Sequence, residues 1–117
     1  MLRLWRATVN TRNGLAFAIR SEQAVREELV ALVLSLPLAW LIGTSLMRRI
    51  ELVAAVVMVL VVELLNTAIE KLADRLTTEH DAQIGRVKDM GSAAVGVALV
   101  TAGLFWLFAI AERIGVI

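Results

Sequence analysis

Residues 63–75 constrain this chain more than any other stretch, because they carry a row of acidic side chains out of an apolar segment. On a helix, Glu63, Glu70 and Asp74 fall within about 20° of one line. Two polar residues flank that line: Asn66 and Thr67. With a rise of about 1.5 Å per residue, Glu63 lies roughly 10 Å deeper along the axis than Glu70. An ionised group inside a membrane costs on the order of 2.5 kcal/mol or more, so the row indicates a functional site. The alternative is a polar seam between packed helices, although small or amide residues would serve a seam better than stacked acids.

The composition predicts a membrane protein. The mean hydropathy is +0.77, and 59% of the residues are hydrophobic. A soluble domain with this composition would expose large apolar patches. The absence of cysteine excludes disulfides and thiolate metal sites. A formal net charge of +1 gives no general affinity for nucleic acid, and no nucleic-acid partner is expected. Residues 1–117 are expected to form a single domain.

Three apolar stretches are long enough to cross a hydrocarbon core of about 30 Å: residues 29–47, 50–69 and 91–111. Arg48 and Arg49 are expected to mark the turn between the first two. The second helix is expected to continue past the bilayer to Leu76, and residues 77–86 to form a polar loop. The predicted fold is therefore an all-α membrane protein with three transmembrane helices.

Residues 1–28 interleave five arginines with apolar side chains, a pattern typical of an amphipathic helix lying on the membrane surface. The Asn-Gly pair at residues 13–14 predicts a break into two helical pieces. Glu22 and Arg26 are spaced i and i+4, which favours an ion pair on a helix.

The distribution of charge predicts the topology. With three spans, the N-terminus and the 71–90 segment lie on one side of the membrane, and that side holds nine of the twelve Lys and Arg residues. The positive-inside rule places this side in the cytoplasm.

This topology brings carboxylates and cations to the cytoplasmic interface. They are Glu22, Glu28, Glu70, Asp74, Arg86, Lys88 and Asp89. Carboxylates there suit Mg²⁺, which usually binds one or two of them together with substrate phosphates. Lys88 and Arg86 are placed to bind phosphate oxygens, and Glu63 to accept a proton from a hydroxyl at membrane depth. The pattern predicts phosphoryl transfer to a lipid alcohol, without the P-loop or the protein-kinase motifs.

Three spans are too few to enclose a nucleotide and to shield buried acids from lipid. An oligomer with sites between subunits is therefore expected. Ser92, Gly96 and Gly103 give the third span a small-residue face that favours close helix approach.

Several runs of residues resemble the signature of the prokaryotic integral-membrane diacylglycerol kinases. They are Glu63-Leu-Leu-Asn-Thr-Ala-Ile-Glu70, Asp74-Arg75 and Gly85-Arg-Val-Lys-Asp-Met-Gly-Ser-Ala-Ala-Val95. The similarity extends over nearly the whole chain. It implies a homotrimer with one surface helix and three membrane helices per subunit, located in the bacterial cytoplasmic (inner) membrane. It also implies phosphorylation of diacylglycerol with MgATP to phosphatidic acid.

The resemblance further implies roles for single residues. Glu63 matches the proposed general base, and Glu22 and Glu70 match residues that serve metal ions. Lys88 matches a residue that contacts nucleotide phosphates. Further nucleotide contacts are expected from Arg3, Arg6, Glu22, Glu70, Glu79, Gly85, Arg86 and Asp89. Substrate contacts are expected from Arg26, Glu28, Glu63 and Ser92. Supporting roles in the same site are expected for Asn66 and Asp74.

Other functions remain open from the sequence. A sister group that phosphorylates undecaprenol is similar but tends to follow Lys-Asp with alanines, whereas Met90-Gly91-Ser92 follows here and favours diacylglycerol. A small ion-coupled transporter subunit would explain Glu63 as a proton carrier but would leave the other interfacial charges without a purpose. A structural or regulatory membrane subunit would make the acids ion-pair partners of Arg75 and Lys88.

Overall fold

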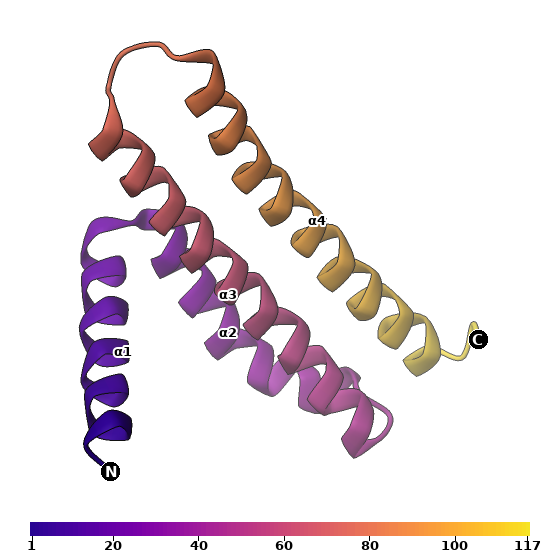
Figure 1. Cartoon of the computed structure of the whole chain (residues 1–117). Coiled ribbons are helices and arrows are strands. Elements are labelled where there is room, and N and C mark those ends of the chain that lie inside the picture. The colour runs from indigo at the N-terminus through magenta and orange to yellow at the C-terminus, as the bar shows by residue number, and fades with distance from the viewer.

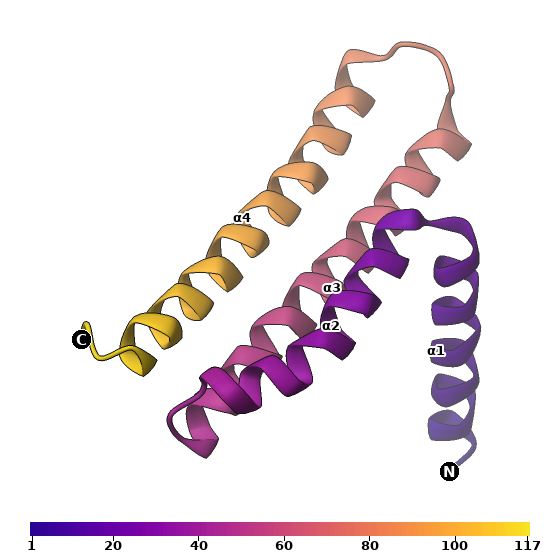
Figure 2. The same ribbon diagram turned by 180° about the vertical axis from the view of Figure 1, so that it is seen from behind.

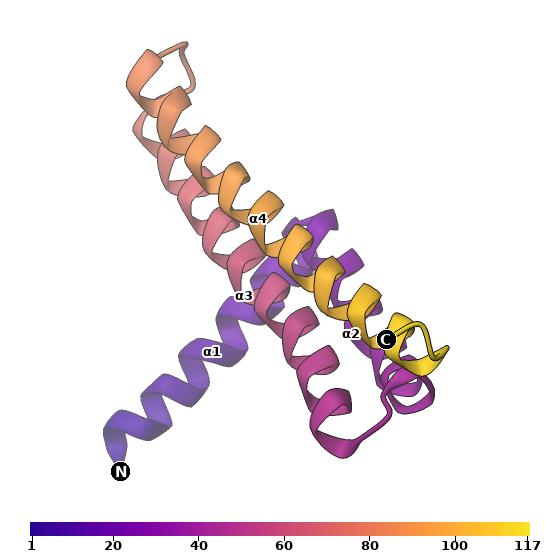
Figure 3. The same cartoon turned by 90° about the vertical axis from the view of Figure 1, so that its right-hand side faces the viewer.

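The computed structural model describes residues 1–117 and is entirely helical, as the sequence predicts (Figure 1). The four helices are α1 Leu2–Ser21, α2 Gln23–Ile42, α3 Leu46–Leu76 and α4 Ala82–Arg113. α3 packs against both α2 and α4, whereas α1 diverges from this bundle (Figures 2 and 3). The region where α1, α2 and α3 meet is also the region of the acidic row.

Two of the helices, α3 and α4, are long and apolar enough to cross a membrane. They contain 31 and 32 residues. At about 1.5 Å per residue each runs for roughly 46–48 Å, which exceeds a hydrocarbon core of about 30 Å. The predicted spans 50–69 and 91–111 lie within these two helices. The remaining length of α3 carries the acidic row toward the loop that joins it to α4.

The first predicted span, residues 29–47, is not one helix. α2 ends at Ile42, and residues 43–45 connect it to α3. The apolar part of α2, residues 29–42, is therefore only about 21 Å long. This length is less than the thickness of the hydrocarbon core, about 30 Å, which the stretch is predicted to cross.

The turn between α2 and α3 also lies earlier than predicted, because Gly43 and Ser45 end one helix and begin the next. Gly43 donates its backbone N–H to the Ala39 carbonyl (2.9 Å). The Ser45 hydroxyl accepts a hydrogen bond from the Arg48 N–H (3.1 Å) and caps α3. A Cβ at Gly43 would lie 2.5 Å from Cγ of Arg49, so the turn requires glycine. Arg48 and Arg49 consequently lie inside α3 rather than at the turn.

The N-terminal segment breaks at Glu22 and not at residues 13–14. α1 is continuous through the Asn-Gly pair, because a glycine inside a helix costs only about 1 kcal/mol relative to alanine. Glu22 has an extended backbone (φ −127°, ψ 119°). The Arg26 guanidinium donates to the carbonyls of Ile19 (2.8 Å) and Arg20 (3.3 Å), which stabilises the end of α1. The prediction of an ion pair between Glu22 and Arg26 is wrong, because Arg26 binds these carbonyls and Glu22 pairs with Lys71 instead.

The loop between α3 and α4 is shorter than the predicted 77–86, because Asp81 caps α4. Its carboxylate accepts hydrogen bonds from the N–H groups of Gln83 (2.9 Å) and Ile84 (3.0 Å). Gly85 and Arg86 consequently lie in the first turns of α4.

Few side chains are buried within one chain. Only 13 of the 117 residues are buried, so most of the large apolar side chains are exposed. The buried apolar residues form two clusters, which are Ala18 with Val25 and Leu60, and Ala39 with Leu52 and Ala109. The first cluster holds α1, α2 and α3 together beside the acidic row. The second joins α2, α3 and α4 near the other end of the bundle.

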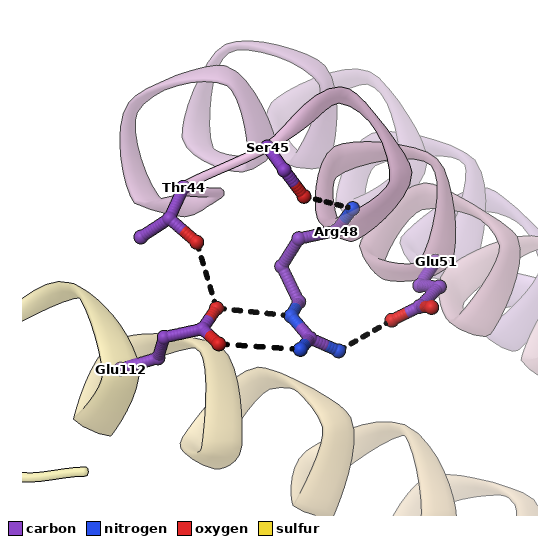
Figure 4. Close-up of polar contacts among 5 residues, drawn as sticks. All are labelled: Thr44, Ser45, Arg48, Glu51 and Glu112. Carbon is purple, nitrogen blue, oxygen red and sulfur yellow. Dashed lines mark hydrogen bonds and ion pairs between the residues drawn. The ribbon is translucent and has the colours of Figure 1, made fainter.

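Polar side chains join α3 to the end of α4 beside the α2–α3 turn (Figure 4). Arg48 donates from Nε to Oε1 of Glu112 (3.0 Å) and from Nη1 to Oε2 of Glu51 (2.6 Å). The Thr44 hydroxyl donates to Oε1 of Glu112 (2.8 Å). We call these four residues, Thr44, Arg48, Glu51 and Glu112, the Arg48 clasp. The clasp fixes the bundle at the end of α3 that lies farthest from Glu70.

Candidate functional site

Four carboxylates gather where α1, α2 and α3 meet. Glu63 is half-buried, and the negative charges of Glu28, Glu70 and Glu22 act on it. We call these four residues the acidic cluster. Glu28 lies near the start of α2, where partial burial, and then the neighbouring Glu27, raise the pKa of its carboxyl group. The expected meeting of the acidic row with the N-terminal segment is present in the structure.

Lys71 joins the acidic cluster to α1. Its Nζ lies 2.9 Å from Oε1 of Glu22 and 5.1 Å from the centroid of the Phe17 ring. A carboxylate and an aromatic face together hold the ammonium group in one place. From the sequence, Lys71 is expected only to add to the cytoplasmic positive charge, and this contact with Glu22 and Phe17 is not predicted. Its position next to Glu70, one turn beyond Thr67, was the available signal.

A mostly apolar groove of about 520 Å³ lies between α1 and α3. Its lining includes Phe17 and Leu64, and Thr67 and Lys71 supply polar groups. This volume, with apolar walls and a few polar groups, is typical of a site for a small molecule. The groove lies beside the acidic cluster, because Lys71 lines the groove and pairs with Glu22.

α4 contacts the acidic row at two points. Lys88 forms an ion pair with Asp74, so these two residues, both expected at the cytoplasmic interface, lie next to each other. Farther along both helices, Gly91 packs directly against Asn66. The Asn66 side-chain amide donates to Oε1 of Glu70 (3.2 Å), so the supporting residue and the predicted metal ligand are in contact.

Other predicted site residues are not brought together within one chain. Arg3 and Arg6 lie near the free end of α1, which Figure 1 shows far from the 77–81 loop that contains Glu79. Asp89 and Ser92 are exposed on α4, and their side chains form no hydrogen bond or ion pair. The roles assigned to them and to the remaining nucleotide-contact residues, Gly85 and Arg86, stay predictions.

The carboxylates are compatible with a partial magnesium site. No three carboxylate or histidine side chains lie close enough together to hold a metal ion by themselves. Mg²⁺, however, usually takes one or two protein carboxylates and completes its shell with water and phosphate oxygens. Glu22 and Glu70 are both half-buried, and each has one neighbour that orients its carboxylate, Lys71 and Asn66 respectively.

Comparison with known proteins gives a consistent result over most of the chain. The family model described as prokaryotic diacylglycerol kinase matches residues 10–110. The protein named diacylglycerol kinase from Escherichia coli strain K12 is 36% identical over 113 residues, covering 97% of this chain and 93% of its own. The diacylglycerol kinase of Pseudomonas aeruginosa is 38% identical over 104 residues, covering 89% and 85%. That of Haemophilus influenzae is 36% identical over 100 residues, covering 86% and 85%.

Proposed function

Since this chain belongs to the prokaryotic diacylglycerol kinase family and is a lipid kinase, we propose that it transfers the γ-phosphoryl group of ATP to diacylglycerol. The products are phosphatidic acid and ADP. The observation that carries this proposal is the acidic cluster, in which the half-buried Glu63 of an apolar helix lies near three further carboxylates. The lipid hydroxyl needs one carboxylate as a base that accepts its proton. The metal ion bound to the nucleotide needs other carboxylates as ligands.

Glu63 acts as the general base in this proposal. The hydroxyl oxygen of diacylglycerol attacks the γ-phosphorus while the hydroxyl proton passes to the Glu63 carboxylate. The bond between the γ-phosphorus and the oxygen that bridges to the β-phosphate breaks, and ADP leaves with that electron pair. Most of the rate enhancement comes from positioning and from neutralising charge, as expected for phosphoryl transfer.

Glu22 and Glu70 would hold Mg²⁺, and Lys88 and Arg86 would bind phosphate oxygens. The metal ion supplies positive charge against the phosphates when it is bound. Lys88 is already oriented by its ion pair with Asp74, and Glu70 by its hydrogen bond with Asn66. Further nucleotide contacts from Arg3, Arg6, Glu79, Gly85 and Asp89 belong to the same proposal.

The diacylglycerol occupies the groove between α1 and α3, with its head group toward Arg26, Glu28 and Glu63. The apolar walls suit acyl chains, and the polar groups at Thr67 and Lys71 suit the glycerol part. Ser92 supplies a further contact from α4.

The enzyme is a trimer in the bacterial cytoplasmic membrane. α1 lies on the cytoplasmic surface, and α2, α3 and α4 cross the bilayer. The support for assembly is the small buried fraction of a single chain, 13 of 117 residues. Asp89 and Ser92 are exposed in the single chain, and a neighbouring subunit brings them to a shared site.

The decisive experiment offers diacylglycerol and undecaprenol side by side to the purified protein in mixed micelles. Transfer of labelled phosphate from ATP is measured with and without Mg²⁺. Magnesium-dependent labelling of diacylglycerol alone is the expected result. Preference for undecaprenol would assign the chain to a different lipid substrate. Transfer to neither lipid, from protein shown to be folded, would overturn the proposal in favour of an ion-coupled transporter subunit.

A further inference from the structure

One close contact between α3 and α4 involves a buried amide. Asn66 is only 7% exposed, and its Oδ1 is buried without a hydrogen-bond partner. A Cβ at Gly91 would clash with that oxygen and would lie 3.3 Å from Cγ of the same side chain. No side chain larger than the hydrogen of glycine fits this position unless the Asn66 amide moves.

This contact is specific to one glycine of α4. A Cβ added at Gly85, Gly96 or Gly103 meets no atom within 4 Å. The contact therefore does not reflect a general small-residue face of the helix. It reflects the position of a single polar side chain, that of Asn66.

The Asn66 amide is held in one orientation from two sides. Its Nδ2 donates to Oε1 of Glu70 (3.2 Å), while its Oδ1 faces Gly91. The opposite orientation would place the amide oxygen against the Glu70 carboxylate, two acceptors with no proton between them. Because the amide is planar, any displacement of Oδ1 also moves Nδ2 and breaks the hydrogen bond to Glu70.

We propose that Gly91 is a positioning residue for phosphoryl transfer, which acts through Asn66 on the Glu70 carboxylate. This inference rests on the proposed function, in which Glu70 holds Mg²⁺. The lack of a side chain at Gly91 allows the Asn66 amide to lie against α4, and the amide fixes the carboxylate. Outer residues that orient a metal ligand are commonly worth about 10–100-fold in affinity or activity.

The kinetic test is a double-mutant cycle on the full-length enzyme in mixed micelles. Gly91→Ala is expected to lower kcat/KM for MgATP by about 10–100-fold and to raise the Mg²⁺ concentration required for half-maximal rate. Gly96→Ala on the same helix is the matched control and is expected to behave as wild type. In an Asn66→Ala background, adding Gly91→Ala is expected to have no further effect, because the amide that the methyl group displaces is gone. An equal loss in both backgrounds, or no loss in Gly91→Ala, would overturn the inference.

A metal-free measurement separates this inference from the proposed function. In NMR spectra of the protein in micelles without Mg²⁺ or ATP, Gly91→Ala is expected to shift the Asn66 side-chain amide and the Glu70 carboxyl resonances, the latter toward its value in Asn66→Ala. Unchanged resonances would refute the positioning role even if the enzyme phosphorylates diacylglycerol. An inactive wild-type enzyme would refute only the function. If Gly91→Ala does not fold, Asn66→Ala/Gly91→Ala is expected to fold, and a double variant that also stays unfolded would contradict the proposed contact.

Discussion

Glu63 and Glu70 lie on the same face of α3 but differ in their surroundings. Glu70 accepts a hydrogen bond from Asn66, whereas Glu63 lies deeper in the apolar part of the helix and forms no hydrogen bond or ion pair. A carboxylate without a fixed partner is free to accept a proton, and one held by an amide is suited to bind a cation. Substitutions of the two residues are therefore expected to change different kinetic parameters.

Glu63→Gln is expected to lower kcat by about 10²–10⁴-fold with little change in KM for MgATP, since only the proton acceptor is lost. Glu70→Gln is expected to raise KM for MgATP as well. Steady-state kinetics with diacylglycerol in mixed micelles separate the two effects. Glu51→Gln, the same chemical change at the other end of α3, is the control and is expected to retain full activity. Near-normal turnover of Glu63→Gln would exclude the general-base role.

At the residue scale, helical periodicity was sufficient to predict which side chains share a face, but not which partners they take. The row from Glu63 to Asp74 follows from spacing along one helix. The helix is interrupted at Glu22, and two contacts depend on this interruption. Glu22 pairs with Lys71, and Arg26 binds a carbonyl at the end of α1. Such tertiary contacts depend on how the helices are rotated relative to each other, and the sequence pattern of a single helix does not determine that rotation.

At the scale of elements, the interior of each helix was predictable, whereas several ends were not. Long apolar runs predicted α3 and α4 over most of their length. The ends depend on single capping groups, Ser45 for α3 and Asp81 for α4, and an analysis of apolar runs gives these too little weight. A serine that follows a glycine closely, between two apolar runs, was the signal for the α2–α3 turn.

The Arg48 clasp yields a prediction about stability alone. Glu112→Gln removes the carboxylate that Arg48 and Thr44 share, so the apparent Tm is expected to fall by about 2–4 °C. The activity on diacylglycerol at a temperature well below Tm is expected to stay unchanged, because the clasp lies at the opposite end of α3 from the acidic cluster. Thermal unfolding in detergent at low and high NaCl measures the effect.

The loss of Tm in this variant is expected to shrink as salt screens the ion pairs. Gln23→Ala, a substitution of an exposed polar residue outside the clasp, is the control for a nonspecific loss of Tm. A salt-independent fall in Tm, or a large fall in kcat, would contradict the assignment of the clasp to stability.

At the scale of the whole molecule, a single chain leaves much of its apolar surface and two of the proposed site residues exposed. The large apolar side chains of α4 are mostly exposed, and the exposed Asp89 and Ser92 have no partner within the chain. Lipid can cover the apolar surface but cannot complete a polar site. The proposed trimer does both, because neighbouring subunits bring polar groups to the interfaces.

Native mass spectrometry of the purified enzyme in detergent is expected to give three times the chain mass of 12.8 kDa. The same species is expected at every protein concentration at which the enzyme is active, since the proposed site is shared between subunits. A fully active species with the mass of one chain would exclude shared active sites.

The short apolar part of α2 has a consequence for the surrounding membrane. For α2 to cross a bilayer in the proposed arrangement, its roughly 21 Å must match a hydrocarbon layer of about 30 Å, and local thinning of the bilayer is one way to relieve such a hydrophobic mismatch. A lipid in the thinned annulus beside α2 has its glycerol hydroxyl closer to the midplane than a lipid elsewhere. Since Glu28 at the start of α2 lies near Glu63, the thinning brings that hydroxyl toward the depth of the proposed base. In the proposed arrangement, an α2 that is shorter than the hydrocarbon layer would help the substrate to reach the proposed base, which lies below the interface.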